Sequence, residues 1–145
     1  MEEIITLRQY LEDGRYDDAL ALATELEEMS RDDKVNKIRS YARILLLHLI
    51  KQAAEKRTTR SWEVSIRNAA REVAYVNQRR SSGGSYLEEA ELREIIAEAY
   101  QSALENASLE AFGGIYDDVT LGQMVNRAEI EAQALAIIVA GSNGH

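Results

Sequence analysis

The stretch VNKIRSYARILLLHLIK, from Val35 to Lys51, decides the fold. Its apolar residues recur at intervals of three or four, the period of an α-helix, at Val35, Ile38, Ala42, Leu45 and Leu49. Further apolar residues cover the other sides, at Ile44, Leu46, Leu47 and Ile50. We therefore expect a helix that is buried nearly all round at its middle and lies at the centre of the molecule.

Similar apolar stripes predict helices upstream of this segment. An N-terminal helix is expected to end at Gly14, because glycine at this position typically stops a helix. A second helix begins at Asp17. Ser30 with Asp33 then predicts a capping box that opens the central helix as a separate element.

Three more helices are expected downstream, the last two with a capping box at their start. The starts lie near Arg60, at Ser85 and at Thr120, and the ends at residues 81–84, near Asn106 and at Gly141. No segment shows the alternation of apolar and polar residues, over a useful length, that would predict a β-strand instead. The predicted fold is all-α, a single-domain bundle of five or six helices over residues 1–145, with 141–145 as a frayed tail.

The composition excludes several classes of protein. The 145 residues include no cysteine and no proline, so disulfides and cysteine-bound zinc are ruled out and helices are never broken by proline. No leader peptide and no membrane span are indicated, and the expected location is the cytoplasm. The formal net charge of −8 disfavours attraction of the whole molecule to nucleic acid.

Motifs for cofactor and metal binding are missing from the sequence. The chain lacks a dinucleotide glycine fingerprint, a phosphate-binding loop, a zinc helix motif and a calcium loop. A di-iron bundle needs two Glu-x-x-His pairs, but the two histidines are His48 and His145. We therefore predict no cofactor, no metal and no assigned catalytic residue.

The residue best suited to acid–base chemistry is His48, on the central helix. Tyr41, Lys51 and Trp62 complete a candidate cluster around it. One interpretation is a partly buried histidine within the core, and the other is an enzyme centred on His48. A catalytic interpretation also needs a nucleophile, an orienting partner and a cleft, and the sequence indicates none of these clearly.

Residues 51–80 are basic in an acidic chain. Eight Lys or Arg against three acids give this segment a local net charge of +5. It is either an anion site for nucleic acid or an acidic protein, or a solvated face balanced by neighbouring acids. The candidate anion-binding residues are Lys56, Arg57, Arg60, Arg67 and Arg71.

The apolar run from Leu135 to Ala140 covers more than one face of the sixth helix. An exposed stripe of this size is unusual on a monomer, so a homodimer or another protein partner is expected. The favoured function is therefore a non-catalytic helical protein that acts through protein–protein interaction or self-association. Nucleic-acid binding through residues 51–80 stays an open alternative.

Three parts of the sequence also carry a resemblance to a known family. They are Ile44 to Lys51, Arg60-Ser61-Trp62 with Ser65-Ile66-Arg67, and Glu25 to Ser30 upstream. Together they resemble the central signature of the family called domain of unknown function 29, common in cyanobacteria, over about Gly14 to Gln123. The resemblance implies an all-helical fold and no established activity.

Overall fold

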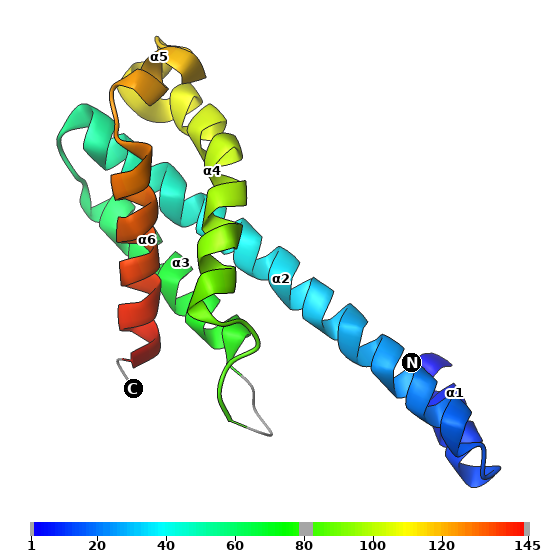
Figure 1. Ribbon diagram of the computed structural model, residues 1–145. Coiled ribbons are helices and arrows are strands. Elements are labelled where there is room, and N and C mark those ends of the chain that lie inside the picture. Colours follow the sequence, from blue (N-terminus) through cyan, green and yellow to red (C-terminus); the bar gives the residue numbers. More distant parts are fainter. Residues whose placement is uncertain (1, 79–82, 144–145) are drawn as a thin grey trace. The chain divides into compact units, whose positions relative to one another are not determined.

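The computed structural model describes residues 2–78 and 83–143, with side chains described up to residue 141. Its regular elements are helices, which confirms the predicted all-α class (Figure 1). Their bounds are α1 Glu2–Glu12, α2 Tyr16–Glu55, α3 Arg60–Asn77, α4 Glu89–Glu110, the 3₁₀ turn η1 Ala111–Gly114, α5 Asp118–Gln123 and α6 Arg127–Asn143.

The chain forms two compact units, which are described separately. Unit 1 covers Met1–Val35 and unit 2 covers Asn36–His145. Helix α2 contributes residues to both units. That residues 1–145 form a single domain stays a prediction.

Unit 1 contains α1 and the first part of α2. Gly14 ends α1 as predicted, at φ +74°. The N–H groups of Gly14 and Arg15 donate to the carbonyls of Leu11 and Tyr10, at 3.2 and 2.8 Å, which is the Schellman pattern. Ala19 is the buried apolar residue of this unit, and α1 buries none.

Helix α2 continues through residue 30, so the predicted capping box at Ser30 and Asp33 is wrong. The second and third predicted helices are one element, Tyr16–Glu55. Neither glycine nor proline occurs between Gly14 and Gly83, so no residue in this stretch strongly disfavours helix. A serine and an aspartate alone do not end a helix that apolar residues continue.

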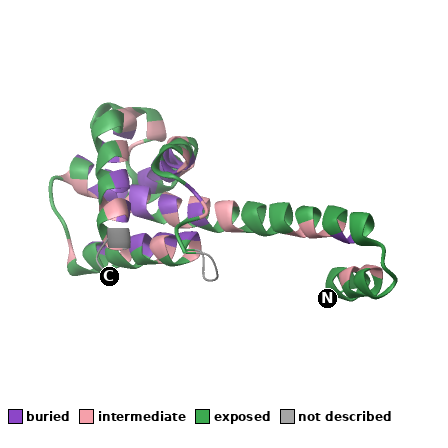
Figure 2. Ribbon diagram, turned by 60° about the horizontal axis from the view of Figure 1, so that its bottom comes forward, coloured by how far each residue is buried: buried purple, intermediate pink, exposed green. Residues whose placement is uncertain are grey.

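The part of α2 in unit 2 supplies the core, as expected. Its buried apolar residues are Ile38, Ala42, Leu45, Leu46, Leu49, Ile50 and Ala54 (purple in Figure 2). Burial is not complete around the helix, because the Ile44 side chain is 44% exposed. Arg39 of α2 pairs with Glu98 of α4 at 2.9 Å, and α6 packs against both α3 and α4.

Helix α3 begins where the sequence predicts, at Arg60, with the Thr59 side chain accepting a hydrogen bond from the Trp62 N–H. It ends at Asn77, before the predicted stop, and residues 79–82 lie outside the described part. The Asn77 side chain donates to the Leu87 carbonyl and accepts from the Leu87 N–H, at 3.1 and 2.8 Å. These bonds tie the end of α3 to the start of α4.

The two capping residues predicted further downstream are also wrong. The N-cap of α4 is Glu88 instead of Ser85, and the Glu88 N–H donates to the Glu91 side chain at 3.3 Å. Asp117, instead of Thr120, caps α5 by accepting from the Thr120 N–H at 2.8 Å.

The predicted sixth helix is divided into α5 and α6. The Asn126 side chain accepts from the Glu129 N–H at 3.0 Å, which starts a new helix after α5 ends at Gln123. Helix α6 passes the predicted stop at Gly141 and reaches Asn143. Residues 144 and 145 of the predicted frayed tail lie outside the described residues.

Candidate functional site

The structure brings together Lys51 and Trp62, two members of the predicted cluster. The Lys51 Nζ lies 4.6 Å from the centre of the Trp62 ring, and both side chains are buried. His48 is half-buried and precedes Lys51 by one helical turn. Tyr41 lies seven residues before His48, about 10 Å along the helix axis, and is not part of this group.

A carboxylate that sequence reasoning missed neutralises Lys51. Glu110, at the end of α4, accepts a hydrogen bond from the Lys51 Nζ at 3.0 Å. The Lys51 side chain is 7% exposed, so its charge has lost most of its contact with water. The Glu110 carboxylate and the electron-rich face of the Trp62 ring together offset this loss of hydration.

Arg57, in the connection between helices α2 and α3, also contacts Trp62. Its guanidinium carbon is 4.7 Å from the ring centre, and its Nε donates to Glu55 Oε1 at 2.9 Å. The second Glu55 oxygen accepts from the Phe112 N–H at 3.3 Å. We call Lys51, Glu55, Arg57, Trp62 and Glu110 the Trp62 cluster.

The charge state of Glu55 follows from these contacts. Burial raises the pKa of its carboxyl, but the hydrogen bonds from Arg57 and the Phe112 N–H, with the charges of Arg57 and Lys51, outweigh burial. The net result is a lowered pKa. Glu55 is therefore ionised at neutral pH. Its two oxygens connect Arg57 of the Trp62 cluster to the backbone of η1 at Phe112.

The Glu55 contact holds η1 in an uncommon backbone conformation. Phe112 adopts φ +52°, which a residue with a side chain rarely does, and its ring meets Tyr116 edge to face at 5.4 Å. Gly114 has φ +80°, and a Cβ there would lie 2.9 Å from the Leu109 carbonyl oxygen. The turn therefore needs glycine at 114 and an anchor at Phe112.

His48 lies beside the cluster without a hydrogen bond to its buried Nδ1 within the described residues. Burial lowers its pKa, the charge of Lys51 lowers it further, and Glu110 partly opposes both. The imidazole is therefore neutral at pH 7. No side chain of the Trp62 cluster orients it as a catalytic triad would.

The lowered pKa of His48 predicts a pH-dependent stability. In the unfolded chain His48 binds a proton near its ordinary pKa of 6.5. In the folded chain its lowered pKa keeps the imidazole neutral to a lower pH. The free energy of unfolding should therefore fall as the pH drops from 7.5 to 5.5, by at most about 1.4 kcal/mol per pH unit. Urea titrations at each pH measure this fall.

His48→Gln should flatten this pH dependence. Glu55 does not interfere, because a lowered carboxyl pKa removes stability only below about pH 4.5. An unchanged slope in the His48 variant would contradict the burial of a neutral imidazole.

The structure separates the candidate anion-binding residues into two groups. Arg57 belongs to the Trp62 cluster, and Lys56 follows α2 in a left-handed conformation at φ +56°. Arg60, Arg67 and Arg71 lie exposed along α3. Residues 79 and 80 of the basic segment lie outside the described part of the chain.

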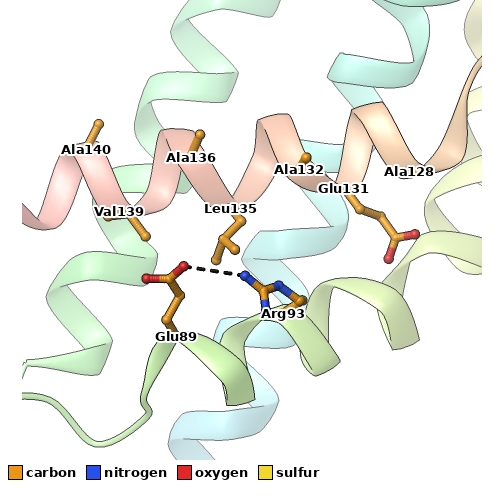
Figure 3. Close-up of a pocket in the computed structure, with 9 residues that line it drawn as sticks. All are labelled: Glu89, Arg93, Ala128, Glu131, Ala132, Leu135, Ala136, Val139 and Ala140. Carbon is orange, nitrogen blue, oxygen red and sulfur yellow. Dashed lines mark ion pairs between the residues drawn. The ribbon is translucent and has the colours of Figure 1, made fainter.

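Helices α4 and α6 form a groove of about 590 Å³ (Figure 3). Leu135 and Val139 of α6 line it. Its alanines recur every fourth residue and are exposed, at Ala128, Ala132, Ala136 and Ala140. Charged side chains from both helices also line it, at Glu89, Arg93 and Glu131.

Membrane-spanning helices and metal-binding clusters are absent from the described residues. In residues 2–78 and 83–143, no helix combines the length and apolar character needed to cross a membrane. In the same residues, no group of three His, Asp or Glu side chains is placed to share a metal ion.

Comparison with known proteins gives one match. No curated protein and no solved structure matches the chain. The sequence profile of the family described as Domain of unknown function DUF29 matches residues 4–114, about three quarters of the chain, including every member of the Trp62 cluster. The chain belongs to the DUF29 family.

Proposed function

We propose that this protein is a non-catalytic helical module that acts by self-association, as a homodimer joined through the groove between α4 and α6. The supporting observation is the groove itself, in which four exposed alanines and two larger apolar residues of α6 lie in one concave surface. Apolar surface gathered in this way typically marks an interaction site. A cytoplasmic location fits a cysteine-free chain.

A second copy of the chain is the occupant that the groove fits best. A two-fold contact places the same surface on both sides, so it needs charges of both signs. The groove supplies them, because Glu89 and Arg93 pair at 3.5 Å on α4, and Glu131 pairs with Arg127 at 2.9 Å on α6. Alanine at every fourth position also lets two α6 helices approach closely in antiparallel orientation.

An enzyme centred on His48 has less support. Lys51 and Glu110 form an ion pair with each other, and Glu55 is bound by Arg57 and the Phe112 N–H. These charged groups are therefore already paired within the protein. The groove does not include His48. These contacts favour a structural role for the Trp62 cluster.

The proposal predicts that Ala136→Glu separates the dimer. A carboxylate in the middle of the apolar contact would lose its water without gaining a partner, which weakens association by about 100-fold or more. Size-exclusion chromatography with light scattering should give twice the 16.3 kDa chain mass for the unmodified protein and the single mass for the variant.

Gln133→Glu is the matched control. It adds the same charge to the same helix at an exposed residue that does not line the groove, and the dimer should persist. A single chain mass for the unmodified protein at about 100 μM, or equal masses for both variants, would contradict the proposal.

A further inference from the structure

We infer that the outer face of α3 is a second interaction surface, which binds the acidic unit 1 of another copy of this chain. The inference rests on the proposed function in that the chain associates with itself. It uses different residues from the α4–α6 groove, so the two can fail separately.

Unit 1 lacks the means to support its own fold. Segments below about 40 residues usually need disulfides, a metal or association with another chain, and isolated helices shorter than about 12 residues are marginal in water. Helix α1 has 11 residues, and the chain has no cysteine. Helix α1 has no buried residue, and Ala19 is the buried apolar residue of the described part of unit 1.

Unit 1 instead exposes apolar side chains on an acidic background. Six large ones are exposed, at Ile4, Ile5, Leu11, Tyr16, Leu20 and Met29. Residues 1–35 contain eleven Asp or Glu and four Lys or Arg, a net charge of −7. The surface that covers this unit must therefore be both basic and partly apolar.

The outer face of α3 has these properties. Arg60, Arg67 and Arg71 lie within a sector of about 40° of the helix, and Val64 and Tyr75 widen it to about 80°. We call these five residues the arginine stripe. Val64 is 36% and Tyr75 58% exposed, and both acids of α3, Glu63 and Glu72, fall outside the sector.

The three arginines are available for an intermolecular contact. Within residues 2–78 and 83–143, Arg60, Arg67 and Arg71 form no ion pair, whereas Arg57 is used by the Trp62 cluster. Their aliphatic stems also extend the apolar surface that Val64 and Tyr75 begin. A phosphate backbone would use the charges and leave the apolar part uncovered, so an acidic amphipathic helix fits better.

Unit 1 carries acids at a similar spacing. Arg60 and Arg67 are seven residues apart, as are Asp18 and Glu25, whereas Arg67 and Arg71 are four apart and Glu25 and Glu28 three. Asp18 also pairs with Arg15 at 2.8 Å. Glu25 and Glu28 are exposed on α2.

A charge exchange between two copies tests the inference. In the stripe-reversed variant, Arg67→Glu and Arg71→Glu make the α3 face acidic. In the unit-reversed variant, Glu25→Arg and Glu28→Arg make unit 1 basic. Because the natural chain has no cysteine, a donor dye at Ser30→Cys and an acceptor at Ser61→Cys label one site each in separate copies.

Energy transfer between the natural copies is expected, and it should weaken with added salt. Each reversed variant mixed with itself should lose it, by about tenfold or more in apparent affinity. Mixing the donor-labelled unit-reversed copy with the acceptor-labelled stripe-reversed copy should restore it, because this pair carries both dyes at the exchanged contact. Arg8→Glu is the control: it changes the net charge by the same amount as Arg71→Glu, but it lies in unit 1. This variant should not weaken the energy transfer.

Three results would overturn the inference. One is energy transfer that is the same in the natural, stripe-reversed and unit-reversed proteins, or that is absent from the natural protein. Another is rescue only when both reversals are in one chain, which would show docking within that chain. The third is loss of single-stranded oligonucleotide binding in the stripe-reversed variant with no rescue between copies. The light-scattering mass of Ala136→Glu reports on the groove independently of all three.

Discussion

Trp62→Ala is expected to lower the free energy of unfolding by about 3–5 kcal/mol. The indole is 9% exposed and has Lys51 and Arg57 against its ring, at 4.6 and 4.7 Å. Its removal leaves a cavity and takes away one of the two groups that compensate the buried Lys51 charge. Urea unfolding followed by circular dichroism measures the loss, since Trp62 is the single tryptophan.

Two further variants identify the cause of this loss. Trp62→Phe keeps an aromatic ring between the two cations, and we expect it to restore more than half of the stability. Val64→Ala, on the same helix but 36% exposed, should cost under about 1 kcal/mol. A Trp62→Ala variant as stable as Val64→Ala would mean that the Trp62 cluster does not hold α2, α3 and α4 together.

Helical periodicity was enough to predict the all-α class and most of the core, but not every helix boundary. On α3 four of the five predicted inward residues, Trp62, Ile66, Ala69 and Val73, are buried and the fifth, Val76, is half-buried. The predicted start near Arg60 is confirmed. This success has a local cause. Apolar residues three and four apart share one face of any helix, whatever that face packs against.

Contacts between distant residues were beyond this reasoning. Lys51 and Glu110 are 59 residues apart, and Glu55 and Phe112 are 57 apart. No local pattern marks Glu110 as the partner of Lys51, because acids are frequent along α4. The positive φ of Phe112 has a weak signal in the Gly113-Gly114 pair that follows it, which indicates a turn but not its anchor.

The predicted capping residues were wrong at all three positions. Ser30, Ser85 and Thr120 do not cap helices, whereas Thr59 and Asp117, which the capping patterns did not indicate, do. Each of these side chains can accept a backbone hydrogen bond, so the type of residue alone does not decide. The backbone must also leave the helical conformation there, and at Ser30 it does not, because α2 continues through this residue with no glycine or proline nearby to end it.

The matched region contains the whole arginine stripe but only part of the α4–α6 groove. Residues 4–114 include the whole Trp62 cluster, but α5 and α6 lie beyond them. One wall of the α4–α6 groove is therefore outside the matched region. Self-association through α6 is accordingly a property to establish for this chain, and the arginine stripe, within the matched region, is the surface to compare among family members.

Leu46→Ala is the second large effect that we expect, with a loss of about 3–4 kcal/mol in the free energy of unfolding. Leu46 is fully buried in the part of α2 that supplies the core of unit 2, so its removal leaves a cavity that the surrounding helices cannot fill. Urea unfolding followed by Trp62 fluorescence measures it, and an unchanged denaturant slope would show that two-state unfolding persists.

Ile44→Ala decides between the sequence-based and the structural description of this helix. The apolar run alone places Ile44 and Leu46 in the same core, so both substitutions would cost several kcal/mol. The structure leaves Ile44 44% exposed, and its truncation should then cost under about 1 kcal/mol. Equal losses in the two variants would mean that Ile44 is covered in solution, by a surface outside the described core.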